Sequence, residues 1–483
     1  MVTADPSYLS ATEALALFRE KALSPVELMQ AVIARAETVE PTVNAFTWEF
    51  FDAALESARE AEARYLGKGD DPRPLEGIPV AIKEEMGIAG QPNTFASEVY
   101  ADYVADHTAP LAERVLAAGG IVHARTTQPE FACAGFTWSR LFGDTRNPWN
   151  TAFDVGGSSG GAGASLAAGT TTLAGGSDIG GSIRIPASCC GVVGYKPPYG
   201  RVPQDPPFNL DHYCHEGPLA RTVADCALFQ NVISGPHPRD IASLRDTVVL
   251  PAEPGDVRGW KVALSLDLDG WDVDPDVRAN TLAAAEALRA AGAEVEEVSI
   301  GWDRREIIEA AAIHFGAIFG AWVAALLEEH RDKLTPYAID FATVTGAAAS
   351  SGVLRGYELE GNATMALGAV LEEYRILLCP TLAIPALPAG PAGLEAGKGA
   401  DFGIHALPAS DHLMTIPFNI ASRCPVISMP SGFSRDGVPT GVQVVARTFA
   451  DADAFAAAAA IEAIGPWAQG LRPAVEAVAA SAD

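Results

Sequence analysis

Two short loops rich in glycine and serine constrain this chain more than any other feature. The first is residues 156–161 (GGSSGG) and the second is residues 178–184 (DIGGSIR). In the second loop Ser182 follows two glycines shortly after the apolar run 171–174, which indicates a buried strand that ends in a loop. A serine placed in this way can expose its hydroxyl while neighbouring backbone N–H groups converge on the same point. Such an arrangement can stabilise an oxyanion.

The segment between the two loops, residues 160–168, consists almost entirely of glycine, alanine and serine. We expect a helix there that ends at Gly169, because glycine readily adopts the left-handed conformation found after helix C-termini. The small side chains would let the two loops approach each other closely. The serines of both loops could therefore face one pocket.

Known loop motifs leave more than one interpretation open. The first loop lacks the Gly-Lys-Ser/Thr ending of a P-loop, and residues 161–166 (GAGASL) do not match the dinucleotide pattern G-x-G-x-x-G. Residues 156–160 do satisfy G-x-S-x-G, the nucleophile elbow of α/β-hydrolase esterases. In that interpretation Ser158 is the nucleophile and His405 or His412 is the base. A flexible loop without any catalytic role is the remaining alternative.

The region 154–200 as a whole resembles the signature sequence of the amidase signature family of serine hydrolases. Shorter similar motifs lie at residues 77–83 (GIPVAIK), 146–150 (RNPWN), 217–225 (GPLARTVAD), 417–419 (PFN) and 437–443 (GVPTGVQ). The resemblance covers nearly the whole chain. It implies an enzyme, an amidase that hydrolyses linear amide or related C–N bonds.

The resemblance also implies a Ser-Ser-Lys triad without metal or cofactor. Ser182 would be the nucleophile, Ser158 the bridging serine that follows a cis peptide, and Lys83 the base. The corresponding oxyanion hole is formed by backbone N–H groups of Ile179, Gly180, Gly181 and Ser182. Asp178 and Arg184, which flank this loop, are expected to support it through hydrogen bonds or an ion pair.

The proton transfers that we expect place one demand on Lys83. A lysine accepts a proton only when it is neutral, so its pKa must be lowered by burial or by nearby positive charge. Residues 80–82 (VAI) indicate an apolar strand that could bury it, whereas Glu84 and Glu85 would favour the charged form if they lie close. Lys83 would then take a proton from Ser158 and return it to the leaving group. The acyl-enzyme on Ser182 would be hydrolysed by water.

Alternating strand and helix patterns, together with the resemblance, predict an α/β protein with the amidase signature fold. We expect a large, twisted, mixed and mostly parallel sheet covered on both faces by helices. Capping boxes at Ser10 and Ser24 predict two helix starts within an N-terminal helical segment, residues 1–70. A catalytic core (71–258), a smaller subdomain that shapes the substrate pocket (259–370) and C-terminal elements that complete the sheet (371–483) would follow.

Composition and charge limit the kinds of molecule that this protein is expected to bind. The formal net charge of −28 and the pI near 4.6 oppose nucleic-acid binding. Seven scattered cysteines without a C-x-x-C pair indicate reduced thiols, and neither a zinc site nor a disulfide framework. An uncharged segment long enough to cross a bilayer is lacking. We therefore expect a cytoplasmic enzyme that acts on a small molecule as a monomer or homodimer, without a nucleic-acid or membrane partner.

The substrate is predicted only by class. Residues 301–360 carry an apolar stripe at helical spacing, which is typical of a helix face packed on the core: Ile308, Ala312, Phe315, Phe319, Trp322 and Leu326. The resemblance implies that this region shapes the substrate pocket, so its aromatic residues could line an apolar acyl or leaving-group site. We expect a small or medium neutral amide, anilide or carbamate, xenobiotic compounds included, with esterase activity as a side activity. Residues 215–217 (HEG) are similar to nylon cyclic-dimer hydrolases, and the same signature occurs in the glutaminase component of tRNA-dependent amidotransferases, so both functions are alternatives.

One departure from the family pattern lies close to this region. Residues 124–131 (ARTTQPEF) carry Arg125 and Thr127 where the family usually has lysine and asparagine. No expected triad member is affected. The substitution bears on local contacts near the mouth of the pocket.

Overall fold

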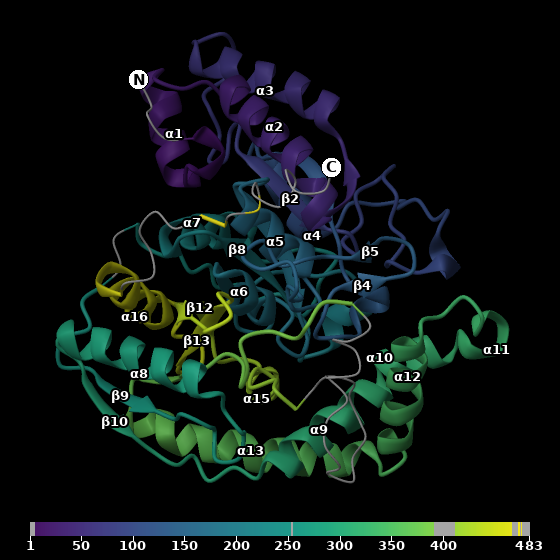
Figure 1. Cartoon of the computed structure of the whole chain (residues 1–483), viewed down its shortest axis with the longest axis vertical. Coiled ribbons are helices and arrows are strands. Elements are labelled where there is room, and N and C mark those ends of the chain that lie inside the picture. The colour runs from purple at the N-terminus through teal and green to yellow at the C-terminus, as the bar shows by residue number, and fades with distance from the viewer. Residues whose placement is uncertain (1–4, 253–254, 391–410, 466–471, 474, 476–483) are drawn as a thin grey trace.

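The structure is a computed structural model of the 483-residue chain, and it describes residues 5–252, 255–390, 411–465, 472, 473 and 475 (Figure 1). An eleven-stranded sheet has the order β1-β3-β2-β6-β8-β7-β12-β13-β11-β9-β10. Its strands are β1 (Phe46–Glu49), β2 (Pro79–Lys83), β3 (Ile121–Thr126), β6 (Leu173–Asp178), β7 (Val193–Lys196), β8 (His215–Ala220), β9 (Lys261–Leu264), β10 (Glu294–Glu297), β11 (Ile376–Pro380), β12 (Val426–Phe433) and β13 (Pro439–Ala446). Strands β4 (Trp138–Ser139) and β5 (Gly143–Asp144) form a separate hairpin.

Helices surround this sheet. They are α1 (Ala11–Glu20), α2 (Pro25–Val43), α3 (Phe51–Tyr65), α4 (Pro110–Ala117), α5 (Gly160–Ala168), α6 (Arg184–Cys190), α7 (Val223–Ile233), α8 (Pro275–Ala290), α9 (Arg304–Ala317), α10 (Phe319–Ala324), α11 (Leu327–His330), α12 (Pro336–Ala349), α13 (Val353–Glu373), α15 (Pro417–Ile420) and α16 (Asp451–Ile464). Figure 1 shows α1 to α3 at one end of the molecule and α8 to α13 around the other. The predicted class, an α/β protein with a large mixed sheet and the amidase signature architecture, is confirmed, although antiparallel pairs outnumber parallel ones in the described sheet.

The sheet is mixed, with parallel pairs in two places. Strands β3, β2 and β6 are mutually parallel neighbours, as are β11, β9 and β10, and antiparallel pairs connect the two groups. Successive residues of a strand point to opposite faces. In β2, Val80 and Ile82 accordingly lie in the large core that contains residues of α4 and α7, whereas Ala81 lies in the core that contains α5. Helices therefore cover both faces, which is why the central strands read as continuous apolar runs.

The N-terminal helices begin where the capping boxes predict. The hydroxyl of Ser10 accepts a hydrogen bond from the Glu13 N–H at 3.2 Å, and that of Ser24 accepts one from the Glu27 N–H at 3.1 Å. Helix α5 ends at Gly169, which adopts the left-handed conformation with φ +77°. The predicted starts of α1 and α2 and the predicted end of α5 are confirmed.

Strands β9 and β10 belong to the same sheet as the rest of the chain, which places the segment 259–298 on the edge of that sheet. The apolar spacing over 308–326 suggests one continuous helix, but the structure has two helices there. Ile318 has φ −120° and ψ −74°, so α9 ends at Ala317 and α10 starts at Phe319. Phe315 and Phe319 are nevertheless both buried, because α9 and α10 both pack on α12.

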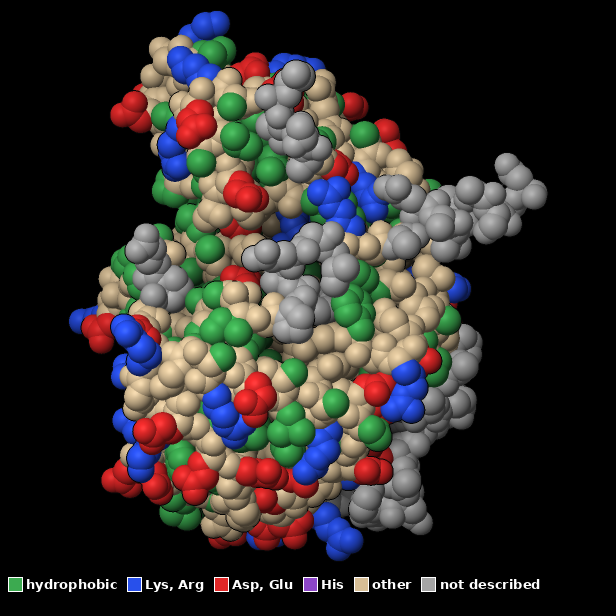
Figure 2. Space-filling view, turned by 60° about the vertical axis from the view of Figure 1, so that its left-hand side comes forward, with side chains coloured by type: hydrophobic (Ala, Val, Ile, Leu, Met, Phe, Trp, Pro, Cys, Tyr) green, Lys and Arg blue, Asp and Glu red, His purple; other side chains and the backbone are tan. Residues whose placement is uncertain are grey.

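Charged side chains of both signs are interspersed on the face that Figure 2 shows, and acidic ones gather towards its lower end. Among the helices that the structure describes, none combines the length and the apolar character needed to cross a membrane.

Candidate active site

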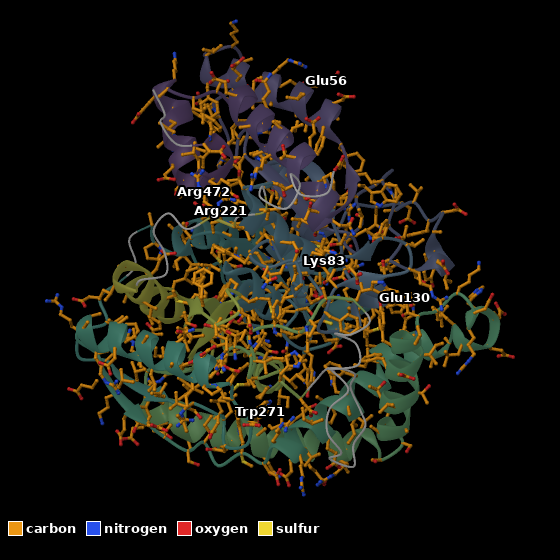
Figure 3. All side chains as sticks on the ribbon, viewed as in Figure 1. Glu56, Lys83, Glu130, Arg221, Trp271 and Arg472 are labelled. Carbon is orange, nitrogen blue, oxygen red and sulfur yellow. The ribbon has the colours of Figure 1, made fainter. Side chains whose placement is uncertain are left out.

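Lys83 is the last residue of β2, and its side chain has no exposed surface. It lies near the middle of the molecule in Figure 3. Its Nζ donates hydrogen bonds to Ser158 Oγ at 2.7 Å and to Ser177 Oγ at 2.9 Å, and it forms an ion pair with Glu85 Oε1 at 3.1 Å. The base and the bridging serine that the sequence predicted are therefore in direct contact.

Two opposing influences act on the pKa of Lys83. Complete burial, the larger one, disfavours the ammonium form and lowers the pKa below its ordinary value of 10.5. The Glu85 carboxylate, through its charge and its hydrogen bond, works to raise it. Glu84 has a different role, because its carboxylate accepts a hydrogen bond from the Thr94 N–H. Of the two acidic residues after Lys83, only Glu85 forms an ion pair with it.

The loop that carries Ser158 is tightly packed. The peptide bond between Gly157 and Ser158 is cis, as the resemblance implies. A Cβ added to Gly157 would lie 2.3 Å from the Phe136 carbonyl oxygen, so no larger residue fits there. The N–H of Ser159 donates to the Ser182 carbonyl oxygen at 3.1 Å, which joins the two glycine-serine loops. The prediction that the small residues of α5 let these loops approach each other is confirmed.

Ser182 lies just before α6 with 6% of its side chain exposed. Among the described residues its hydroxyl has no hydrogen-bonding partner, so the direct contact with Ser158 that a proton relay needs is not formed. The two residues are close in the backbone through the Ser159–Ser182 hydrogen bond. Hydrogen bonds of catalytic groups are often incomplete before substrate binds.

The loop before Ser182 is held by a buried ion pair. Arg184 donates to both carboxylate oxygens of Asp178, at 2.8 and 2.9 Å, and neither side chain is exposed. Burial alone would raise the pKa of Asp178, but the Arg184 guanidinium overcomes this effect and holds that pKa well below its usual range. Asn419 and Gln443 complete the coordination of Arg184 by accepting hydrogen bonds at 2.7 Å each. The C-terminal motifs thus fix the loop of the predicted nucleophile.

Backbone N–H groups in this loop differ in availability. The Gly181 N–H donates to Asp178 Oδ1 at 2.9 Å, so it is not free to bind an oxyanion. It is one of the four N–H groups that the resemblance assigns to the expected oxyanion hole. The N–H groups of Ile179, Gly180 and Ser182 donate to no acceptor in the described part of the chain. Gly181 also has φ +124°, and a Cβ there would lie 2.1 Å from Thr415 Oγ1, so the position requires glycine.

The role of Ser177 was not predicted from the sequence, and Arg125 was wrongly placed near the mouth of the pocket. Ser177 accepts the second hydrogen bond from Lys83 and donates one to Glu85. Arg125 is completely buried and donates to the backbone carbonyls of Ile82, Lys83, Glu84 and Met86. It therefore braces the chain on both sides of the lysine. The parallel pairing of β2 with β6 places Ser177 beside Lys83, and no local sequence signal indicates this pairing.

Histidines do not contact the bridging serine. Among the described residues no histidine forms a hydrogen bond with Ser158, as an α/β-hydrolase triad would require. His412 is buried, which lowers its pKa to about 4, and His405 lies outside the described residues. His215 is buried among backbone carbonyls, with Nδ1 2.7 Å from the Tyr213 oxygen, which is a structural position. The geometry favours lysine over histidine as the partner of Ser158.

A small apolar recess lies beside Ser182. Its cavity volume is about 60 Å³. Phe315, Phe319, Phe341 and Ile416 form its apolar wall, opposite the loop that contains Gly180 and Ser182. No lysine or arginine is among its described lining residues. The recess suits an uncharged group attached to a carbonyl that Ser182 could attack.

One cluster could hold a metal ion. Ligand atoms of Asp211, His212 and His314 lie within 4.8 Å of one another in the described structure. These groups already bond to protein partners: His314 Nε2 is 2.7 Å from Asp211 Oδ1, and His212 Nε2 is 3.3 Å from Glu360 Oε2. The cluster is separate from the hydrogen bonds of Lys83.

The mixed α/β fold with its two joined glycine-serine loops has known relatives, and comparison with them identifies its family. The family model Amidase matches residues 27–454, so the chain belongs to the amidase family and is an amide hydrolase. An acylamidase of Rhodococcus erythropolis is 35% identical over 468 residues, covering 95% of this chain and 96% of the relative. A glutamyl-tRNA(Gln) amidotransferase subunit of Thermosynechococcus vestitus is 35% identical over 483 residues, covering 93% of this chain and 96% of the relative.

A solved structure agrees with this assignment. A bacterial aryl acylamidase of the amidase signature family superimposes with a TM-score of 0.88 at 30% identity, and the match covers 99% of both chains. The chain is therefore similar in sequence and in fold to acylamidases along nearly its full length.

Proposed function

We propose that this amidase cleaves amides or anilides with a small or medium, apolar and uncharged acyl group through an acyl-enzyme on Ser182. Carbamates and esters would be further substrates of the same site. The observation that carries the proposal is the 2.7 Å hydrogen bond between the buried Lys83 amine and the Ser158 hydroxyl, beside the loop of Ser182. The similarity to acylamidases supports the acyl preference.

In the proposed mechanism, neutral Lys83 takes the proton of Ser158 while Ser158 takes that of Ser182. The Ser182 oxygen then forms a bond with the substrate carbonyl carbon, and the N–H groups of Ile179, Gly180 and Ser182 bind the resulting oxyanion. Ser158 passes a proton to the leaving nitrogen as the C–N bond breaks, and Lys83 returns its proton to Ser158 and becomes neutral again. Water attacks the acyl-enzyme by the same relay. The mechanism requires substrate binding to bring the Ser182 hydroxyl into contact with Ser158.

The test follows acylation directly. Wild type, Ser182→Ala, Ser158→Ala and the exposed control Ser57→Ala are mixed with p-nitrophenyl acetate, quenched in acid and weighed by intact mass spectrometry. We expect one added acetyl group in wild type and Ser57→Ala, and none in Ser182→Ala. Turnover of acetanilide should fall by about 10⁴-fold or more in Ser182→Ala. An adduct that persists in Ser182→Ala but not in Ser158→Ala would overturn the assignment in favour of the esterase alternative.

A second candidate function is the glutaminase component of an amidotransferase, which the similarity to such proteins favours. Glutamine carries a carboxylate, whereas the described lining of the recess beside Ser182 offers no lysine or arginine to bind one. We therefore expect the isolated chain to hydrolyse acetanilide and not glutamine. Glutaminase activity that arises only in the presence of partner proteins would favour the second function. The 6-aminohexanoate cyclic dimer, assayed in parallel, tests the nylon-oligomer alternative.

A further inference from the structure

A second cavity, larger than the recess at Ser182, lies next to it. Its volume is about 380 Å³, and it shares the lining residues Ala132, Ile179 and Phe319 with the recess. A substrate whose amide bond lies at Ser182 could therefore extend from the recess into this second cavity. The two lobes differ in character, because the second one also contains acidic side chains.

Acidic residues line this second lobe, and all but one of them have a cation as partner. Asp178 is paired with Arg184 at 2.8 Å, Glu85 with Lys83 at 3.1 Å, and Asp205 with Arg239 at 3.5 Å. Glu216 differs, because no ion pair within 4.0 Å joins it to any described cation. No lysine or arginine is among the described residues that line the lobe.

Glu216 is built into the sheet rather than carried on a flexible loop. It lies on β8 directly opposite Ser177 of β6, and residues opposite each other in an antiparallel pair point to the same face. Ser177 contacts Lys83 and Glu85 on that face. Only 8% of Glu216 is exposed, and its buried Oε2 has no hydrogen-bonding partner in the described structure. A buried carboxyl oxygen without a partner is costly, and a ligand could supply the missing donor.

The electrostatic surroundings of Glu216 favour a cation. Burial, and next the carboxylates of Asp205 and Glu85, raise the pKa of Glu216 well above its ordinary value, and the charge of Lys83 offsets only part of this effect. A positive charge placed among these groups would offset the repulsion between them and stabilise the ionised form.

Aromatic rings form another wall of the lobe. Trp322 contacts Phe131, Phe95 and Phe208 with ring centroids 4.9, 5.5 and 5.8 Å apart, and all four residues line the cavity. Ring faces attract ammonium groups, most strongly where water is excluded. Carboxyl groups and aromatic rings in one cavity are a suitable environment for an organic ammonium ion.

We propose that this second lobe is a subsite for a protonated amine, with Glu216 as its principal anchor. The substrate would then be amphiphilic: an apolar acyl group fills the recess at Ser182, and the amine half of the amide carries a positive charge. This inference deepens the proposed function and rests on it.

Matched substrates test the subsite. We would measure kcat/KM for 4-(aminomethyl)acetanilide, which is cationic at neutral pH, and for 4-methylacetanilide, which is neutral. Wild type should prefer the cationic anilide by about tenfold, the size of a desolvated cation–π and ion-pair contribution. In Glu216→Gln this ratio should approach one, whereas the exposed control Glu286→Gln should keep it. A ratio near one in wild type, or an unchanged ratio in Glu216→Gln, would overturn the subsite.

A binding measurement separates this inference from the proposed function. The Ser182→Ala protein is titrated calorimetrically with benzylammonium and with benzyl alcohol. We expect the Ser182→Ala protein to bind benzylammonium and not benzyl alcohol. The double variant that also carries Glu216→Gln should bind neither compound. Equal binding of both compounds, or none of the cation, rejects the subsite whatever the enzyme turns over. If wild type does not hydrolyse 4-methylacetanilide at all, the proposed function fails instead.

Discussion

Two lysines in the described part of this enzyme are completely buried, and their surroundings differ in one decisive respect. Lys83 ends β2 and Lys196 ends β7, and neither side chain is exposed. The Nζ of Lys83 meets two serine hydroxyls. The Nζ of Lys196 meets the carbonyl oxygens of Cys424 at 3.0 Å and Ser422 at 3.3 Å. Its other side-chain neighbour, His215 Nε2 at 3.5 Å, is uncharged because burial lowers the pKa of His215 to about 3. A carbonyl has no proton to give, so Lys196 is a structural donor, whereas Lys83 can exchange a proton with the serine hydroxyls.

The charges around the two amines differ as well. Burial lowers the pKa of both lysines, and for Lys196 the positive charge of Arg184 lowers it further, to about 7. At Lys83 the Glu85 carboxylate opposes the effect of burial. A lowered pKa therefore does not by itself identify a catalytic base. The comparison indicates that the groups within hydrogen-bonding distance decide the role.

The largest expected effect comes from exchanging each lysine for methionine, which has a similar length and no charge. Lys83→Met should lower kcat/KM for acetanilide at neutral pH by about 10³-fold, the usual contribution of a general base. Lys196→Met should lower it by less than about tenfold, since Lys196 contacts neither serine. Circular dichroism would establish that both variants are folded. Comparable losses in the two variants would break the distinction between the lysines.

The second effect concerns stability. Lys196→Met leaves buried carbonyls without a donor, so the free energy of unfolding at pH 9 should fall by about 2 kcal/mol. The pKa of Lys196 is about 7 in the folded protein and about 10.4 in an unfolded chain, so the unfolded state binds more protons between these values. The contribution of Lys196 to stability is therefore fully present above the unfolded pKa and is lost as the pH falls towards 7.

Urea unfolding of wild type and Lys196→Met at pH 7 and pH 9 would measure this difference. The stability deficit of the variant should disappear or reverse at pH 7, because a change approaching about 1.4 kcal/mol per pH unit over two pH units exceeds the deficit of about 2 kcal/mol. A deficit that does not depend on pH would show that Lys196 keeps one protonation state throughout.

The two lysines also show what the sequence could and could not predict. Strand patterns, capping boxes and the long signature stretch were enough for the α/β fold, the helix starts and the pairing of Lys83 with Ser158. Both lysines follow similar apolar runs, VAI before Lys83 and VGY before Lys196. Nothing local distinguishes them, and only the resemblance directed attention to Lys83.

Residues that the sequence analysis missed act through partners far away in the chain. The carbonyl that binds Lys196 most closely is 228 residues away, and the Ser177 hydroxyl is 94 residues from Lys83. Strand order decides such contacts, and a single sequence does not reveal strand order. The break between α9 and α10 was missed for a related reason, because the apolar spacing continues across Ile318. Domain boundaries and the catalytic roles stay predictions.

The smallest expected effect comes from removing the charge of Glu85, which is paired with Lys83 and has no counterpart among the described hydrogen-bonding partners of Lys196. Because Glu85 works to raise the pKa of Lys83, Glu85→Gln should lower that pKa further while an amide oxygen can still accept the hydrogen bond from Ser177. The proposed mechanism needs neutral Lys83, so kcat/KM should rise with pH through this pKa, and the rising limb should move to lower pH in the variant.

Acetanilide hydrolysis measured across the stable pH range would show this displacement, and the exposed Glu286→Gln would serve as the control. The pH dependence of unfolding assigned to Lys196 should not change in Glu85→Gln, because Lys196 has no carboxylate among its described hydrogen-bonding partners. A rising limb that stays in place would mean that it reports some group other than Lys83. A limb that moves to higher pH would mean that Glu85 disfavours the charged lysine, contrary to the 3.1 Å ion pair.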